Sequence, residues 1–310
     1  MKEIIETTVE ESNEELSHLK ESLRHAVDEG DVQKAEDLKA AILPHLEVVR
    51  NELGITPEKA QEMMGGKYFG PEAIEKAYRI KLERKDIPKI PFTKEDLEKA
   101  QECGDLLVLR VDKDSDGRPL TMERIEELVS TDGTSAAKKA DKWWVKEKLF
   151  SHDIPRAGWA LISGSLMMAT AGEKYLEQTK ILASNVLANV FMGRDLPQEY
   201  KDAVEELEKK APILKVRQYV ADDNEVSREV AELKINQLLR HTPVEVFYDT
   251  FLHYHNKKED EGALYSFHNI WTNNFLPGKG IVAVGSNGVS CRHAVQDGNH
   301  PFFGVISRRS

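Results

Sequence analysis

The sequence predicts an α+β protein, in which a helical N-terminal region precedes a mixed domain that ends in a β-region. Amphipathic helical patterns cover most of residues 1–262. Two apolar strand segments, Leu106–Val111 and Gly158–Ser163, interrupt them. From residue 263 onwards the chain is rich in Gly, Asn, Ser, His and aromatic residues, which are poor helix formers. So abrupt a change predicts a separate role for the C-terminal segment, in binding.

Residues 10–53 are predicted to form a helical hairpin. Apolar residues recur at helical spacing on both sides of a break at 29–31 (Glu-Gly-Asp). They are Leu16, Leu19, Leu23 and Val27 before the break, and Leu38, Ile42, Leu46, Val49 and Leu53 after it. Such an amphipathic pair suits self-association or docking on a neighbouring domain. A helical layer packed on its own core is an equally good interpretation.

A proline-punctuated segment at 85–91 (KDIPKIP) predicts a domain boundary. We therefore expect a helical N-terminal region at 1–91 and an α+β domain at 92–310. Within the first region, Thr56-Pro57 and Gly70-Pro71 each open a helix, because proline is favoured in the first helical turn.

The second domain is expected to alternate between strands and helices. Thr93 caps a helix that ends at Gly104, and the strand Leu106–Val111 leads through a turn to a helix at Thr121–Val129. Another helix holds Trp143 and Trp144. After the strand Gly158–Ser163, the pattern predicts helices at about 173–191, 198–209, 222–240 and 243–256. Thr242-Pro243 gives the last of these a clear start.

The C-terminal segment is predicted to contain a β-hairpin and a final strand. Ile281–Gly285 and Val289–His293 flank Ser286-Asn287-Gly288, and Asn-Gly between apolar runs is a strong hairpin signal. Phe302–Arg308 is the expected last strand. This segment has four basic residues and one acid, so the rest of the chain carries the acidic excess.

Charge and composition exclude several classes of function. The net charge of −11 argues against sequence-independent nucleic-acid binding and against an anionic membrane surface. Two cysteines, Cys103 and Cys291, do not make a disulfide framework, and buried free thiols are expected. No apolar run is long enough to span a membrane, and the acidic N-terminus has no secretory signal. We expect a cytoplasmic protein, with export by a signal-less route as the alternative.

One loop resembles a calcium site. Residues 112–123 match an EF-hand loop at its first, third, fifth, sixth and twelfth positions through Asp112, Asp114, Asp116, Gly117 and Glu123. A strand, not a helix, is expected before the loop, and the chain has no second such loop. An acidic turn between a strand and a helix is therefore the favoured interpretation, with calcium as the alternative and no other cofactor expected.

Motifs for catalysis are absent from the sequence. There is no nucleophile elbow, phosphate-binding loop or HExxH pair, and Ser163-Gly164-Ser165 lacks the flanking glycines of an elbow. We expect a protein that is not an enzyme. The alternative is a metal-dependent hydrolase built from Asp112, Asp114, Asp116 and distant histidines.

The C-terminal segment, with what precedes it, resembles the variable proteins that retroelements diversify. The resemblance implies a C-type lectin-like fold with a hypervariable patch at 271–303, opened by Trp271. Adenine-directed mutagenesis of the Asn codons in such a patch cannot produce Glu, Met, Gln, Lys or Trp. Between Thr272 and Phe303 there is no Glu, Met or Trp, and only Lys279 and Gln296 do not fit this rule. In that fold an early strand lies beside the last one, which Leu106–Val111 and the closing GVISRR would supply. The helices at 173–256 are a large insertion for a minimal domain of this kind.

The chain is also similar, over most of residues 65–310, to uncharacterised bacterial proteins that share three of its stretches and differ mainly in the tail. The stretches are PLTMERIEEL, YLEQTKIL and TPVEVFYD. This resemblance implies no activity.

The resemblance implies a binding protein with an unknown protein or surface ligand. Its exposed residues would be Asn273, Asn274, Phe275, Arg292, His293, Gln296, Asp297, Asn299, His300 and Phe302. Its buried scaffold residues would be Trp271, Val282, Val284, Val289, Val305 and Ile306. Short polar and aromatic side chains give contact area and hydrogen bonds at low entropic cost. The alternative is a non-diversified structural or assembly protein, whose tail uses Asn and Gly only for turns.

Overall fold

The computed structural model divides the chain into two compact units. The N-terminal unit contains Met1–Thr56 and Lys89–Thr93, and the main unit contains Pro57–Pro88 and Lys94–Ser310. The structure describes residues 18–19, 21–26, 31, 33–34, 37–38, 41, 54–130, 143–171, 173–191, 195–217, 222–257, 264, 269–285, 288–292, 302–303 and 307–308.

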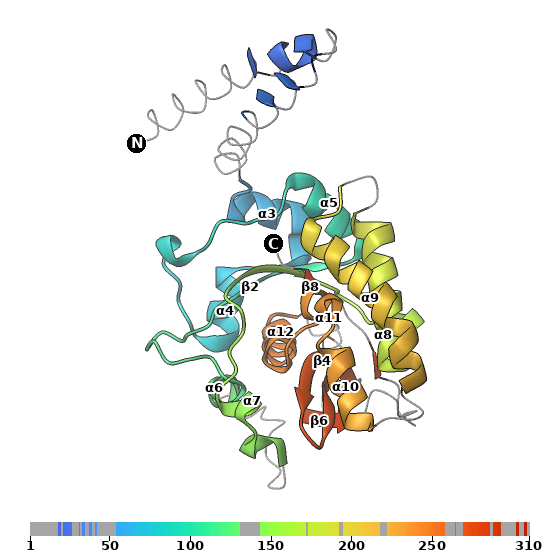
Figure 1. The fold of residues 1–310 in the computed structure, drawn as a ribbon. Helices are drawn as coiled ribbons and strands as arrows, with labels where there is room; N and C mark the ends of the chain where they lie inside the picture. Colours follow the sequence, from blue (N-terminus) through green and yellow to red (C-terminus); the bar gives the residue numbers. More distant parts are fainter. Residues whose placement is uncertain are drawn as a thin grey trace. The chain divides into compact units, whose positions relative to one another are not determined.

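In the N-terminal unit, the described residues on both sides of Asp31 are helical, as the sequence predicts (Figure 1). These are residues 18–19 and 21–26 before Asp31, and 33–34, 37–38 and 41 after it. The Asp31 carboxylate accepts a hydrogen bond from the backbone N–H of Lys34 (3.1 Å), which is how an aspartate caps a helix. The rest of 10–53 lies outside the described residues.

Residues 57–88 belong to the main unit, whereas the sequence placed them in the N-terminal region. They form α3 (Pro57–Met64), β1 (Tyr68–Phe69) and α4 (Pro71–Tyr78), with short 3₁₀ turns at Gly65–Lys67 and Arg84–Asp86. Helix α4 packs along α12 (Pro243–Asn256), and the hydroxyl of Tyr78 donates to the backbone oxygen of Tyr248. These contacts to a helix far along the chain draw the segment into the main unit, and no local sequence signal records them.

The first sheet has the strand order β1-β2-β3-β8. Strands β2 (Leu106–Arg110) and β3 (Gly158–Ile162) pair antiparallel along their whole length, and β8 (Ser307–Arg308) pairs antiparallel with β3. Strand β2 and the last strand, β8, therefore share a sheet, with β3 between them. The prediction that they lie side by side is wrong in that respect. Helix α5 (Lys94–Cys103) precedes β2, and α6 (Met122–Ser130) follows it.

The second sheet, β6-β5-β4-β7, contains the predicted C-terminal hairpin. Its strands are β4 (Asn269–Leu276), β5 (Gly280–Gly285), β6 (Gly288–Arg292) and β7 (Phe302–Phe303). Strands β5 and β6 pair antiparallel, with Gly285 opposite Gly288, which confirms the predicted hairpin. Gly288 belongs to β6 and not to the turn, and Ser286 and Asn287 lie outside the described residues. The expected single strand at Phe302–Arg308 is corrected: β7 pairs parallel with β4 in this sheet, whereas β8 pairs with β3 in the other.

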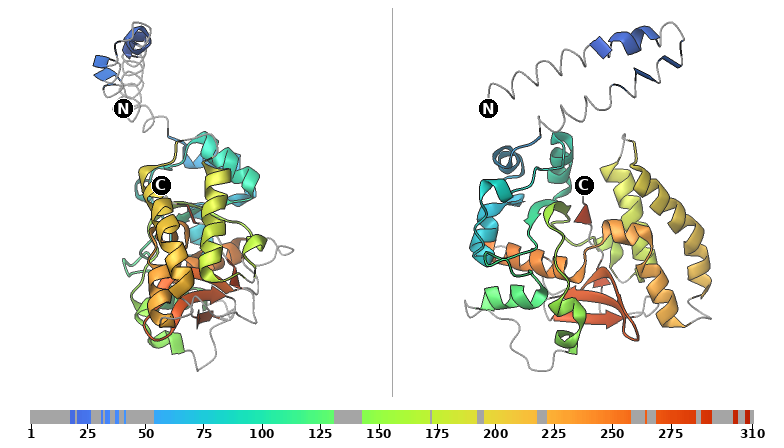
Figure 2. Two further views of the ribbon diagram at one scale, coloured as in Figure 1. Left: turned by 45° about the vertical axis from the view of Figure 1, so that its right-hand side comes forward. Right: turned by 60° about the vertical axis from the view of Figure 1, so that its left-hand side comes forward.

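Helix α12 is the central element of the main unit (Figure 2). It contacts α4, α6, β4 and β5. Thr242 and Glu245 form a reciprocal capping box, with Pro243 in the first turn, which confirms the predicted helix start. Most of its residues from Pro243 to Leu252 are buried, so this helix joins the two sheets.

A group of helices covers the face of the second sheet that is opposite α12 (Figures 1 and 2). They are α8 (Tyr175–Asn185), its continuation as the π-helix η5 (Val186–Val190), α9 (Gln198–Arg217), α10 (Asp223–Ala231) and α11 (Lys234–Leu239). The predicted helix at 222–240 is two helices, and α9 continues through Pro212 to Arg217 instead of ending near 209.

Between β2 and β3, the chain forms the 3₁₀ turn η3 (Trp143–Lys146) and α7 (Lys148–Ser151).

Within the described residues, no helix has both the length and the apolar character that crossing a membrane requires.

The Ser163-Gly164-Ser165 segment follows β3 and serves close packing. A Cβ atom at Gly164 would lie 2.2 Å from the backbone oxygen of Gly104, so only glycine fits there.

Candidate functional site at the C-terminal sheet

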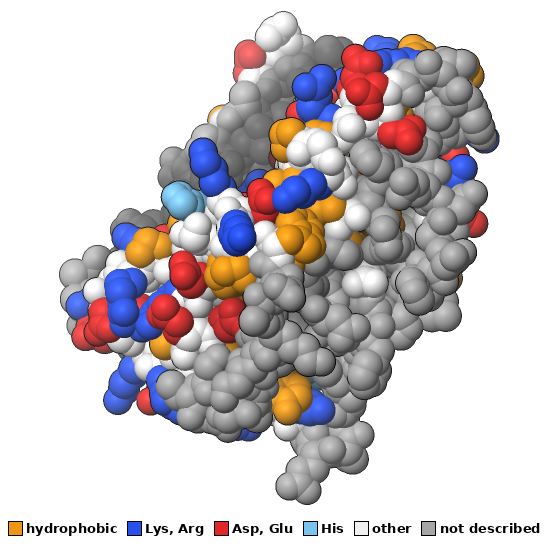
Figure 3. Space-filling view, turned by 90° about the horizontal axis from the view of Figure 1, so that it is seen from below, with side chains coloured by type: hydrophobic (Ala, Val, Ile, Leu, Met, Phe, Trp, Pro, Cys, Tyr) orange, Lys and Arg blue, Asp and Glu red, His pale blue; other side chains and the backbone are white. Residues whose placement is uncertain are grey.

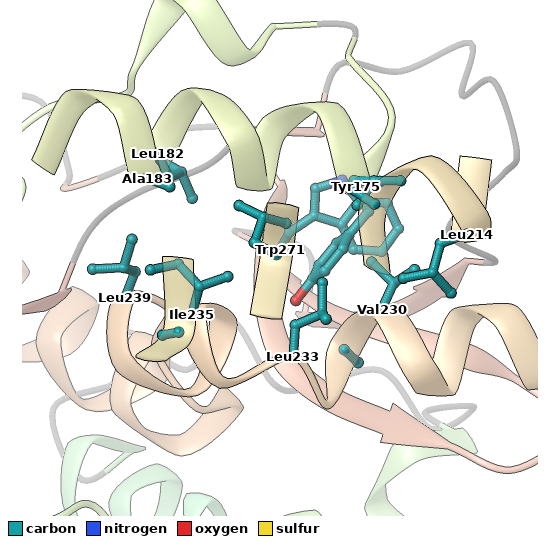
Figure 4. Packing of buried hydrophobic residues seen from close by; sticks show 14 of the residues in the cluster. Tyr175, Leu182, Ala183, Leu214, Val230, Leu233, Ile235, Leu239 and Trp271 are labelled. Atoms are coloured by element: carbon teal, nitrogen blue, oxygen red, sulfur yellow. The ribbon is translucent and has the colours of Figure 1, made fainter. Parts of the chain in front are cut away.

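Strand β4 is fixed in the main unit by buried side chains. Trp271 is 3% exposed and packs edge-on against Tyr175 of α8, with ring centroids 5.4 Å apart (Figure 4). The Tyr175 hydroxyl donates to the backbone oxygen of Thr272 (2.7 Å). Burial raises the pKa of Tyr175 to about 12, against the pull of Arg240, so the hydroxyl keeps the proton it donates. The scaffold prediction is confirmed for Trp271, and also for Val282 and Val284, which are buried.

A second contact comes from Arg240, whose side chain is fully buried beside the sheet. Its guanidinium lies over the Tyr175 ring, 4.1 Å from the centroid, and its Nε donates to Asn236 Oδ1 (2.9 Å). Asn236 in turn accepts a hydrogen bond from the Thr179 hydroxyl (2.9 Å). This polar group ties α8 and α11 together directly behind β4.

Asn273 was expected on the exposed binding surface, and this expectation is wrong. Only 5% of the residue is exposed. Its backbone N–H donates to the backbone oxygen of His241 (3.1 Å), and its side-chain Nδ2 to Gln237 Oε1 (3.3 Å) and the Arg240 backbone oxygen (3.5 Å). The side chain therefore joins β4 to the connection between α11 and α12.

The neighbouring Asn274 marks the point where β4 reaches the surface. Its side chain is partly exposed, and Nδ2 donates to Asp153 Oδ2 (3.4 Å). Burial raises the pKa of the Asp153 carboxyl above its ordinary value, while His152 and Asn274 act in the opposite direction. Phe275 is also partly exposed, and it packs against the helical core on the other side of the strand. Two of the predicted binding residues thus stand at this end of the sheet.

An exposed tryptophan lies at the same end of the sheet. Trp143 of η3 is 37% exposed, and the Lys279 ammonium group lies 4.3 Å from its ring centroid. Lys279, in the turn between β4 and β5, also forms an ion pair with Glu147. Figure 3 looks on to the side of the molecule where η3, α7 and β6 lie in Figure 1, and hydrophobic side chains there are interspersed with charged ones. We call the residues Trp143, Glu147, Asp153, Asn274 and Lys279 the rim.

Cys291 of β6 is half-buried near the rim, and Cys103 is exposed; both are free. The expectation of a buried thiol is thus wrong for Cys103. Burial raises the pKa of the Cys291 thiol to about 12, with a smaller opposing effect of Lys279. A protonated thiol is a poor nucleophile, so this cysteine is not activated for chemistry.

The other predicted binding residues have no described side chains. Arg292 ends β6 opposite Ile281, and Phe302 pairs with Asn269 at the start of β7. His293, Gln296, Asp297, Asn299 and His300 lie outside the described residues, as do the scaffold residues Val305 and Ile306. Val289 lies in β6, with its side chain not described.

The loop at 112–123 is an acidic turn between a strand and a helix, the favoured interpretation. The Asp114 carboxylate is enclosed by Arg124 Nε (2.7 Å) and Arg118 Nε (3.3 Å), and it accepts from the backbone N–H groups of Asp116 and Arg118. Burial raises the pKa of Asp114, but these donors outweigh burial and hold it below its ordinary value. Two arginines thus contact Asp114, which would be a ligand in the calcium alternative.

The four carboxylates of the calcium alternative are not brought together. Among the described residues, which include Asp112, Asp114, Asp116 and Glu123, no group of three or more His, Cys, Asp or Glu is arranged to hold a metal ion. Asp116 pairs with Arg118 at the surface, with 2.7 Å between Oδ2 and Nη2.

Sequence reasoning missed a buried charge cluster, which we call the Arg110 cluster: Arg110, His241, Glu245 and Asp249. Arg110 ends β2, and its Nε and Nη2 donate to Asp249 Oδ1 (3.0 Å) and Oδ2 (2.5 Å). Its Nη1 lies 3.3 Å from Glu245 Oε1, and its Nη2 lies 3.1 Å from His241 Nδ1. All four side chains are buried, so the cluster holds β2 on α12 and is closed to a substrate.

A sequence signal for this cluster existed. Glu245 and Asp249 lie four residues apart in an otherwise apolar helix, which puts two carboxylates on one face. Buried carboxylates require a cation, and Arg110 ends an apolar strand.

Acidification is expected to destabilise the protein through this cluster. Burial raises the pKa of Asp249, but Arg110 and His241 outweigh burial and lower it. Burial, reinforced by Arg110, lowers the pKa of His241 despite the hydrogen bond to Asp249. Both groups bind fewer protons in the folded chain than in the unfolded chain. The free energy of unfolding should therefore fall below about pH 6.5, and further below about pH 4, by roughly 1 kcal/mol per pH unit for each proton.

Urea unfolding between about pH 8 and about pH 5 measures this dependence. His241→Gln should reduce the slope in that range, because it removes the imidazole that titrates in the unfolded chain. An equal slope in this variant would show that other groups cause the loss of stability.

Comparison with known proteins found no matching family model, no similar curated protein and no similar solved structure.

Proposed function

We propose that this protein recognises a ligand through a surface formed by its C-terminal β-region and the adjoining rim. The observation that carries the proposal is the contrast within β4. Residues Ile270–Asn273 are buried, whereas the next two residues, Asn274 and Phe275, are partly exposed. A rigid support under exposed polar and aromatic side chains lowers the entropic cost of binding.

Several features of the rim favour recognition over catalysis. Trp143 offers a large amphipathic contact area, and Lys279, Glu147, Asp153 and Asn274 offer donors and acceptors around it. The Lys279–Glu147 ion pair and the contact of Lys279 with Trp143 limit the rotamers of these side chains before a ligand arrives. The tail beyond β6 continues from this surface in sequence, and it supplies the remaining predicted binding residues.

We further propose that codons 271–303 are diversified by a retroelement in a C-type lectin-like domain. The support is the composition of the tail. Sequencing the locus and its flanks in many cells of the source population tests this directly. Substitutions confined to adenine positions in codons 271–303, with a near-copy repeat nearby, are expected. An invariant tail without a repeat would contradict diversification.

Site-specific photocrosslinking tests recognition itself. A photoreactive benzoylphenylalanine at Asn274, in the full chain and in the source cells, is expected to give a discrete crosslinked product. Lys209, on the exposed face of α9 with 72% of its side chain accessible, is the matched control and should not give that product. The same products at both positions, or none at position 274, would contradict a recognition surface at the rim.

Two adjacent asparagines should respond differently to substitution. Asn273→Ala removes a buried amide that donates to Gln237 and to the Arg240 backbone, and it is expected to cost about 1–3 kcal/mol of stability. Asn274→Ala should stay within about 0.5 kcal/mol of the parent, because its amide is at the surface. Urea unfolding of both variants measures the difference. Equal losses would mean that Asn274 is part of the scaffold and not of the binding surface.

A further inference from the structure

A groove of about 450 Å³ lies between α8–η5 and α9, away from the rim. Ligand sites commonly have volumes of this order. We call it the α8–α9 groove. It is lined by Lys180, Ala183, Ser184, Leu187, Val204, Leu207, Glu208, Ala211, Pro212 and Lys215.

The hollow follows from small residues on facing helices. Ala183 and Ser184 of α8 lie across from Ala211 and Pro212 of α9, and they leave space that longer side chains would fill. Ala183, Leu207 and Ala211 are buried and form an apolar floor, because they also belong to the hydrophobic core beneath.

Both helices depart from regular α-helical geometry along the groove. Helix α8 changes into the π-helix η5, which contains the lining residue Leu187. π-Helical turns are rare in proteins, and those that occur are often found at functional sites. In α9, Pro212 cannot donate the backbone hydrogen bond that the carbonyl of Glu208 would otherwise accept. Two irregularities therefore meet at one apolar groove.

The two ends of the groove differ in charge. Helices α8 and α9 run antiparallel, since Phe191 at the end of η5 contacts Tyr200 at the start of α9 (ring centroids 5.0 Å apart). Lys180, in the middle of α8, comes well before Phe191, and Lys215, late in α9, comes well after Tyr200, so both lie toward the end of the groove away from that contact. Leu187 and Val204 form the opposite, apolar end.

The dimensions fit an extended hydrocarbon chain. Val204 and Lys215 are eleven residues apart on α9, which corresponds to roughly 16 Å along the helix. Glu208 is the one carboxylate among the lining residues, and it lies about two turns from Lys215. Lys180 pairs with Glu177 (3.0 Å), whereas Lys215 makes no ion pair with residues that the structure describes.

We propose that the α8–α9 groove binds a free single-chain amphiphile with a carboxylate head, such as a fatty acid. The carboxylate lies between Lys180 and Lys215, and the hydrocarbon chain covers the floor as far as Leu187 and Val204. This site is independent of the recognition surface, since none of its residues belongs to the rim or the tail.

Calorimetric titration of the full-length protein with monomeric dodecanoate tests the proposal. Saturable binding of one equivalent is expected. Lys180→Gln with Lys215→Gln should weaken it roughly tenfold, because two partly exposed charge contacts are lost. Lys209→Gln with Lys210→Gln, on the same helix but outside the groove, should leave the affinity unchanged. Glu208→Gln should strengthen binding, because it removes the carboxylate that repels the ligand.

Three further comparisons complete the test. Ser184→Trp fills the groove from an exposed position and should abolish binding while the melting temperature stays near that of the parent. Dodecanol should bind more weakly than dodecanoate, and anionic phosphatidylglycerol vesicles should not bind. Four results would overturn the proposal. They are dodecanoate binding that does not saturate, equal dodecanoate affinity of the Lys180/Lys215 and Lys209/Lys210 double variants, dodecanol that binds as tightly as dodecanoate, and binding to vesicles without binding of monomeric dodecanoate.

Discussion

Arg110→Met should lower the free energy of unfolding by about 3–5 kcal/mol, one of the two largest effects that we expect in this chain. The substitution keeps a side chain of similar length but removes the cation from a site where Glu245 and Asp249 are both fully buried. Two buried carboxylates then remain without the guanidinium that both contact. One of them must take up a proton, or water must enter, and both responses cost stability. Urea unfolding at neutral pH, followed by circular dichroism, measures the loss.

Arg118→Met is the matched control for this experiment. Arg118 also pairs with a buried carboxylate, that of Asp114, but 53% of its own side chain is exposed, against 1% for Arg110. Its loss should cost less than about 1 kcal/mol, because Arg124 still contacts Asp114 and water screens the site. Equal losses in the two variants would contradict the role of burial.

A second variant separates charge from packing. Arg110→Met combined with Glu245→Gln and Asp249→Asn removes all three permanent charges of the Arg110 cluster. Because the penalty of the single variant comes mainly from carboxylates without a cation, the triple variant should recover part of the loss. If it is less stable than Arg110→Met, the carboxylates support the fold through contacts other than those with Arg110.

Local patterns predicted the elements that local interactions define. The strands at Leu106–Val111 and Gly158–Ser163, the pairing of β5 with β6 and the start of α12 at Thr242-Pro243 lie where the sequence placed them. Each depends on hydrophobic alternation, turn chemistry or capping within a few residues. The helices and two small sheets confirm the α+β class, whereas the lectin-like fold stays a proposal.

The sequence could not predict features that depend on distant partners. Asn273 and Asn274 are the same residue type in adjacent positions, yet one is buried by Gln237 and the Arg240 backbone and the other is at the surface. Composition favours turns and exposure for both. Similarly, Arg110 meets Asp249 from 139 positions away, and residues 57–88 join the main unit through α12. The sequence therefore led to a candidate site in the C-terminal β-region, which stays a proposal, but it could not show which side chains of β4 are exposed.

The two tryptophans at this sheet provide the second large prediction. Trp271→Ala should cost about 3–5 kcal/mol, because it opens a cavity in the core and removes the edge-on contact with Tyr175. Trp143→Ala should cost less than about 1 kcal/mol, because Trp143 is 37% exposed. Urea unfolding measures both variants. Each keeps three of the four tryptophans, so intrinsic fluorescence can follow the same transitions.

This pair of variants bears directly on the division of β4 into scaffold and surface. Trp271 lies three residues before Asn274, and its ring holds the strand against α8. If the rim depends on that support, Trp271→Ala should reduce the yield of the product crosslinked from position 274, even under conditions where the protein remains folded. Trp143→Ala should reduce the same yield without a loss of stability. A Trp271 variant that keeps both stability and crosslink would show that the sheet is positioned by other contacts. The hydrogen bonds of Thr272 and Asn273 would then be the first alternatives to examine.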